Sequence, residues 1–208
     1  MYQGERFNSI SHLVGVALSL IGVSVLMTLA VQTGDVWKIV SCSIYGAMMI
    51  FLYGFSTLYH SLKGRAKVFF QKLDYVAIYL MIAGTYTPFT LVTLRQESGW
   101  TLLITIWSLA LFGIAQELIR QSTTRRLSLL IYVLMGWLVI TAIKPLWMNL
   151  NSLSLIFLLV GGFAYTAGII FFVNDHRWKH AHGIWHLFVL GGSTFQYFSV
   201  LSEVLRNG

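Results

Sequence analysis

The chain of 208 residues is too apolar for an ordinary soluble domain, because 57% of its residues are hydrophobic and only 10% are charged, whereas about a quarter of the residues are charged in soluble proteins. The net charge of +7 does not indicate a nucleic-acid-binding protein, since the cations lie in short loops between apolar runs and not on one exposed face. The single cysteine, Cys42, excludes an internal disulfide bond and a cysteine-built zinc site.

Seven apolar runs follow one another along the chain, each near the length of about 20 residues that a membrane-spanning helix needs. We expect helices because a helix satisfies its backbone hydrogen bonds internally in lipid, whereas barrel strands would be shorter and would alternate. The sequence therefore predicts an all-α, polytopic membrane protein with a single seven-helix domain over residues 1–208. The predicted spans are 12–31, 40–62, 74–94, 100–119, 128–148, 152–173 and 182–204.

The positions of Lys and Arg predict the orientation of the bundle, because cytoplasmic loops collect positive charge. Most of these residues fall on one side, at Arg6 and in the loops that precede the third, fifth and seventh spans. The opposite side carries only Lys38, Arg95, Lys144 and Arg206. We expect the N-terminus inside and the C-terminus outside, the reverse of a G-protein-coupled receptor. The expected location is the plasma membrane, or the inner membrane of a Gram-negative cell.

A few ionisable side chains lie within the spans, where each costs at least a few kcal/mol and needs a reason to be kept. His60 closes the second span, Asp74 opens the third, and His182 and His186 occupy the first turns of the seventh. All four lie toward the predicted cytoplasmic side. His182 and His186 are four residues apart, which puts their rings on one face of a helix.

Histidines at one depth predict a site for one divalent metal ion, and zinc suits them best. Zinc binds neutral imidazole at about 2.0–2.1 Å and usually takes four ligands, so His60, His182 and His186 would leave one position open. Asp74 could bind the ion directly or through a water molecule. The alternative is an interhelical hydrogen-bond network, although a metal ion would satisfy these polar groups more completely.

Other polar side chains near the membrane surfaces have simpler interpretations. Ser56 lies one helical turn before His60, so its hydroxyl could reach the site, or it could bond back to a carbonyl of its own helix. His12 opens the first span, and we favour a helix-capping role over contact with the polar cluster. Glu203 lies near an outer end, where snorkelling toward the membrane surface or local pairing accounts for it.

Several stretches together carry a recognisable combination of motifs. They are Glu5 with Asn8–His12, Ser56–His60, Lys72–Tyr75, Gly84–Pro88 and His182–Gly192. Over its whole length the chain resembles the progestin and adipoQ receptor (PAQR) family, specifically the bacterial hemolysin III branch. The resemblance implies seven helices, an inside N-terminus and a zinc ion near the inner leaflet. It also implies that His60, His182 and His186 bind the ion, with Ser56 and Asp74 beside them.

The resemblance leaves three classes of function open. The family is similar to alkaline ceramidases, which implies a role in membrane-lipid homeostasis as a zinc-dependent hydrolase of a lipid amide or ester. In this enzyme Asp74 would take a proton, and Ser56 would position the substrate or stabilise the oxyanion. The alternatives are a receptor-like sensor of lipid state with structural zinc, and a pore-forming, cytolytic protein. The expected partners are membrane lipids, and no nucleic acid is expected.

Overall fold

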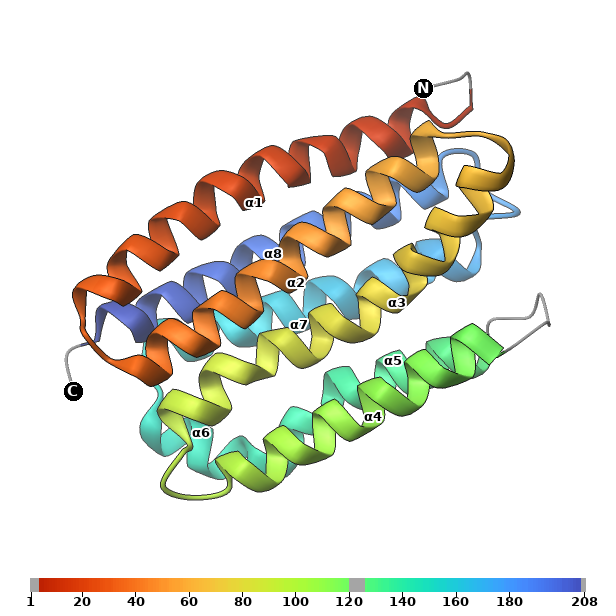
Figure 1. Cartoon of the computed structure of the whole chain (residues 1–208). Helices are drawn as coiled ribbons and strands as arrows, with labels where there is room; N and C mark the ends of the chain where they lie inside the picture. Colours follow the sequence, from red (N-terminus) through yellow and green to blue (C-terminus); the bar gives the residue numbers. More distant parts are fainter. Residues whose placement is uncertain (1–3, 120–125, 207–208) are drawn as a thin grey trace.

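The computed structural model describes residues 4–119 and 126–206, which form a bundle of seven long helical segments (Figure 1). The segments run alongside one another, and the start of α1 and the end of α8 lie at opposite ends of the bundle. The predicted all-α, seven-helix fold is confirmed. The elements are α1 (Arg6–Gln32), α2 (Val36–Ser61), α3 (Gly64–Pro88), η1 (Phe89–Thr93), α4 (Gly99–Ile119), α5 (Arg126–Trp137), η2 (Leu138–Ala142), α6 (Ile143–Asn149), α7 (Ser152–Val173) and α8 (Ala181–Leu205).

Six of these segments are long and apolar enough to cross a membrane: α1, α2, α3 with η1, α4, α5 to α6, and α7. The seventh, α8, is equally long but less apolar, because it carries histidine, serine and glutamine side chains on its buried face. Large hydrophobic side chains such as Ile21 and Ile104 are 65% and 64% exposed on the outside of the bundle. Lipid is the environment in which such a surface is stable, and the chain is a multi-pass membrane protein.

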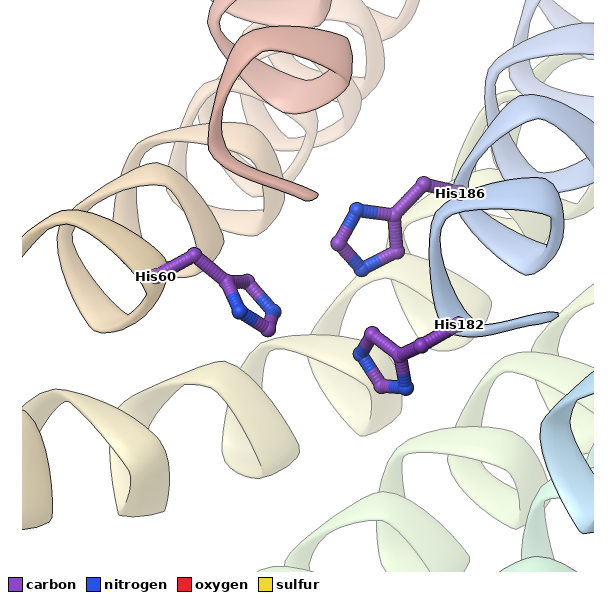
Figure 2. Close-up of side chains that lie close together, drawn as sticks. All are labelled: His60, His182 and His186. Carbon is purple, nitrogen blue, oxygen red and sulfur yellow. The ribbon is translucent and has the colours of Figure 1, made fainter. Parts of the chain in front are cut away.

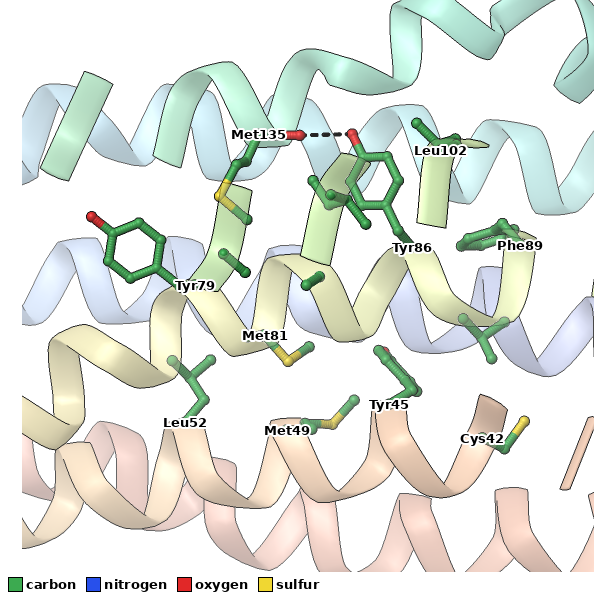
Figure 3. Packing of buried hydrophobic residues seen from close by; sticks show 14 of the residues in the cluster. Cys42, Tyr45, Met49, Leu52, Tyr79, Met81, Tyr86, Phe89, Leu102 and Met135 are labelled. Atoms are coloured by element: carbon green, nitrogen blue, oxygen red, sulfur yellow. Dashed lines mark hydrogen bonds between the residues drawn. The ribbon is translucent and has the colours of Figure 1, made fainter. Parts of the chain in front are cut away.

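The interior between α2 and α3 is filled by apolar and aromatic side chains (Figure 3). Tyr45 and Met49 of α2 meet Met81 of α3, while Tyr86 points the other way and donates a hydrogen bond of 2.8 Å to the backbone oxygen of Met135 in α5. Close approach is also needed where α4 meets α3, since a Cβ atom at Gly113 would lie 2.2 Å from the Tyr79 ring. This packing holds α3 at the centre of the bundle.

The third helix begins earlier than the predicted span. Because α3 starts at Gly64, Asp74 lies well inside the helix instead of opening it, and most of the expected basic loop is helical. The start of α3, which carries most of these cations, and the turn between α7 and α8 lie at the end of the bundle where α1 begins (Figure 1). Arg120 and Arg125, which we assigned to the same side, lie outside the described residues.

The end of the bundle where α1 ends carries a buried polar network. Glu203 is 7% exposed, and its carboxylate accepts hydrogen bonds from Asn151 Nδ2 at 2.8 Å and from Thr93 Oγ1 at 3.3 Å. Lys38 Nζ donates to the backbone oxygens of Val204 at 3.1 Å and Arg206 at 2.7 Å. Of the two interpretations of Glu203, snorkelling is wrong and pairing with neighbouring groups holds, since Arg206 Nη1 also lies 3.8 Å from its carboxylate. Its charge stays buried because neighbouring helices satisfy it.

Candidate metal centre

Three histidines that are far apart in the sequence converge at the end of the bundle where α1 begins. His60 lies in the last turn of α2, and His182 and His186 lie in the first turns of α8. One ring nitrogen of each lies within 4.8 Å of the others, and Figure 2 shows the rings turned toward a common space. His60 and His186 are each 2% exposed. The three rings are positioned to hold a metal ion.

The first turns of α1 hold two of these rings. His60 Nδ1 lies 2.7 Å from Glu5 Oε2, and His186 Nδ1 lies 3.1 Å from the backbone oxygen of Asn8. Carboxylate and carbonyl oxygens only accept hydrogen bonds, so Nδ1 of His60 carries the proton. Ser11 Oγ also lies 3.1 Å from His186 Nδ1, but it donates to the Asn8 oxygen at 2.9 Å, which leaves Nδ1 of His186 as a donor too. In a neutral imidazole the lone pair is then on Nε2, which is the atom left to bind a metal.

His182 follows the same rule through a different partner. Its Nδ1 lies 3.3 Å from Asp175 Oδ2, in the turn that joins α7 to α8. Each of the three rings thus turns Nδ1 toward an acceptor of the protein, so Nε2 is the atom by which each ring would bind a metal ion. Metal-binding histidines are oriented in this way by carboxylates and backbone carbonyls, so the donor set fits a metal ion.

Glu5 is charged at neutral pH and anchors this arrangement. Burial opposes its ionisation, but hydrogen bonds from Lys67, Asn8 and His60 outweigh that effect and lower the pKa of Glu5 to about 2. Lys67 Nζ lies 2.7 Å from Oε1 and balances the charge. In the sequence alone, Glu5 stands out only as part of a motif. Its spacing from Asn8 and His12, by three and seven residues, was the available signal, because it puts all three on one helical face.

His12 does not cap a helix, so that interpretation is wrong. Because α1 begins at Arg6, His12 lies in its second turn, where the backbone is already hydrogen-bonded. Its ring stacks on the ring of His186, with 3.6 Å between centroids and 15° between planes, and meets the edge of Tyr53. The residue is 3% exposed, and neither ring nitrogen has a hydrogen-bond partner within the described ranges. His12 therefore belongs to the polar cluster.

A cavity of about 220 Å³ lies beside the histidines and is lined mainly by apolar side chains of α2, α3, α5, α7 and α8. His182, His186, Ser56 and Asp74 are among its lining residues. The Ser56 hydroxyl is buried and has no hydrogen-bond partner in the described part of the chain, so it does not bond back to its own helix. Asp74 is not in the group of three histidines, although it lines the same cavity.

Comparison with known proteins identifies the family. A family model described as "Haemolysin-III related" matches residues 1–197. The chain belongs to the hemolysin III family. This hemolysin III protein is 46% identical over 202 residues to the protein named "Hemolysin-3" of Bacillus cereus, with 97% of this chain and 92% of the relative covered. The "Hemolysin-3 homolog" of Bacillus subtilis is 43% identical over 201 residues, with 95% and 92% covered.

The likeness reaches beyond bacteria. The human "Monocyte to macrophage differentiation factor" is 26% identical to this hemolysin III protein over 213 residues, with 96% of this chain and 84% of the relative covered. No solved structure matches the chain. The family assignment therefore rests on sequence, and the arrangement of the site rests on the geometry described above.

Replacing Glu5 by leucine is expected to weaken metal binding about 10- to 100-fold, because His60 would lose the acceptor that fixes its tautomer and orientation. Glu5→Gln should lose less, since the amide oxygen still accepts from Nδ1. Competition with a chromophoric zinc chelator measures both affinities. Glu97→Leu, at an exposed glutamate of the opposite end, is the control. Equal affinities for wild type and Glu5→Leu would show that Glu5 does not orient a ligand.

Proposed function

We propose that this hemolysin III protein is a zinc-dependent hydrolase that cleaves an amide or ester bond of a membrane lipid, and so acts in membrane-lipid homeostasis. The observation that carries the proposal is the position of the three histidines. His182 and His186 line an apolar cavity together with Ser56 and Asp74, and His60 completes the group of three. A metal-binding group, a hydroxyl donor and a carboxylate thus adjoin a space suited to an acyl chain.

Three nitrogen donors with an open fourth position are typical of catalytic zinc sites, and His60, His182 and His186 supply such a set. When bound there, zinc would polarise a carbonyl group and make water more acidic. No cysteine lies near these histidines, so the donors favour zinc over ions that prefer sulfur. The distribution of Lys and Arg favours a position at the cytoplasmic surface for this end.

Asp74 and Ser56 have separate roles in this reaction. The Asp74 carboxylate takes a proton from the attacking water, and then returns it to the nitrogen or oxygen of the leaving group. The Ser56 hydroxyl, which has no partner among the described residues, donates a hydrogen bond to the carbonyl oxygen as negative charge develops on it. Water adds across the bond, and the products are a fatty acid and an amine or alcohol.

The charges around the cavity favour a lipid with a neutral head group. Among the described residues that line the cavity there is no Lys or Arg to bind a phosphate. Asp74 and Asp175 would balance the two charges of a zinc ion, while Lys67 already balances Glu5. A phosphate group would bring negative charge to a cavity whose described lining residues include no cation to balance it.

A sensor with structural zinc is the second candidate, and the origin of the ligands supports it. The histidines come from α2 and α8, and the first turns of α1 hold two of them, so one ion would join three helices. Such an ion would stabilise the bundle without turnover, because metal affinity then contributes directly to folding.

Release of fatty acid from a defined lipid separates these candidates. The purified protein in lipid nanodiscs is given a neutral long-chain amide or ester lipid, before chelation, after chelation and after zinc is added back. A hydrolase loses turnover on chelation and recovers it with zinc. Loss of thermal stability on chelation, without turnover in any state, would replace the hydrolase by the sensor. Dye release from liposomes without lipid cleavage would favour a pore.

A further inference from the structure

Gln196 is a buried polar residue of α8 that the chemistry above does not use. It is 6% exposed and lines the same cavity as the histidines. His182, Val189 and Gln196 follow one another at intervals of seven residues, which places them on one face of the helix. Gln196 is ten residues after His186, so it lies about 15 Å farther along the helix axis.

The amide of Gln196 is held in one orientation. Its Nε2 donates a hydrogen bond of 3.1 Å to the backbone oxygen of Leu158 in α7. Turning the amide over would bring Oε1 against that carbonyl, and two acceptors cannot bond to each other. The amide nitrogen therefore faces α7, and Oε1 is turned away from that bond.

The amide oxygen, unlike the amide nitrogen, makes no hydrogen bond to the described part of the protein. Gln196 Oε1 is buried and has no hydrogen-bond partner within the described chain. Packing accounts for the rest of the side chain, because a Cβ atom at Gly161 would lie 3.0 Å from both Cγ and Nε2 of Gln196. Buried polar atoms are normally paired, and Gln196 lines the cavity, so a donor group on a molecule bound there would satisfy this acceptor.

We propose that Gln196 forms a second polar subsite, which binds a hydroxyl group on the acyl chain of the lipid. This inference rests on the proposed function, which places the lipid carbonyl at the histidines. A hydroxyl can donate to Oε1, whereas an ester, ether or ketone oxygen cannot. Because the subsite is about 15 Å from His186 along the helix, the hydroxyl belongs in the distal half of a long chain.

The neighbouring hydroxyl groups do not compete for Oε1. Tyr165 OH is 2.7 Å from Ser193 Oγ, and Thr166 Oγ1 donates to the backbone oxygen of Gly162 at 2.9 Å. Both side chains line the cavity or lie beside it, yet their hydroxyls are already engaged. The acceptor of Gln196 therefore remains for the ligand, and it distinguishes hydroxylated chains from plain ones.

Binding of three matched probes tests the subsite without turnover. The probes are hexadecanamide, its 2-hydroxy form and a form hydroxylated in the distal half of the chain, each displacing a fluorescent acyl probe from the protein in nanodiscs. Wild type should bind the distal hydroxyamide about fivefold more tightly than hexadecanamide, the value of one net hydrogen bond. The 2-hydroxy form should gain nothing from Gln196.

Gln196→Met keeps the length of the side chain but removes the acceptor, so the preference for the distal hydroxyl should disappear while hexadecanamide binds at least as well. Gln71→Met, at a glutamine that donates to Tyr59 OH and does not line the cavity, is the control. Equal affinity of wild type for all three probes overturns the subsite, as does a preference that survives in Gln196→Met. If no probe binds, the cavity is not a lipid site, and the proposed function falls with the subsite.

Discussion

Replacement of His186 by alanine is expected to reduce bound metal from one ion per chain to background. His186 supplies one of three imidazole ligands, and its loss leaves His60 and His182 with too few donors to retain a zinc ion through purification. Elemental analysis of the purified protein measures the effect. Fatty-acid release should fall to background in the same preparation, because the proposed reaction depends on the ion.

The matched control for this substitution is His176→Ala. His176 lies in the same turn region, but its side chain is 65% exposed and is not part of the group of three histidines. Metal content in this variant should equal that of wild type. A full complement of metal in a folded His186→Ala protein would mean that the ion binds elsewhere, and both the hydrolase and the structural-zinc proposals would lose their site.

The fold could be predicted because its main signal is local. Each span is a long apolar run, and lipid leaves such a run little choice except a helix. The grouping of His60, His182 and His186 was also accessible, since His182 and His186 share a helical face and charge placed the end of the second span at the same depth. The depth of a residue in the membrane and the helical face on which it lies can both be predicted from its position in the sequence.

Contacts between helices could not be predicted from residue spacing. The sequence places His12 near the cytoplasmic side, but only the packing of α1 against α8 shows that its ring stacks on His186. Glu203 lies near a membrane surface, yet Asn151 and Thr93 bury it by approaching from other segments. Gln196 carries no charge, so its position in a span did not mark it as a functional residue. In each case the deciding fact is the rotation of one helix against another.

The contacts made by the first turns of α1 change the description of the metal site. None of the predicted ligands lies in α1, and the spacing of Glu5, Asn8 and His12 shows only that they share a helical face. In the structure, Glu5 and Asn8 fix the tautomers of His60 and His186. The first turns of α1 therefore hold ligands from α2 and α8 before an ion arrives. Such preorganisation lowers the cost of binding a metal in a fixed geometry.

Asp74→Asn is expected to lower fatty-acid release about 100- to 10,000-fold, the usual contribution of a positioned general base, while bound metal is retained. The amide has nearly the shape of the carboxylate but cannot accept a proton, so the change separates chemistry from binding. Turnover and metal content, measured on one preparation, give the two readouts. They distinguish a base from a ligand, because a ligand variant would lose both.

Asp35→Asn serves as the control for removing a carboxylate, since Asp35 caps α2 at the opposite end by accepting from Trp37 N. That variant should keep wild-type turnover even if its stability falls slightly. Loss of metal in Asp74→Asn would instead make Asp74 a direct ligand, which is the other arrangement open to a carboxylate beside three histidines. Unchanged turnover would show that Asp74 takes no part in the reaction. Ser56 alone could not then supply the proton transfers that cleavage of an amide or ester requires, because a hydroxyl without a base is a poor proton acceptor.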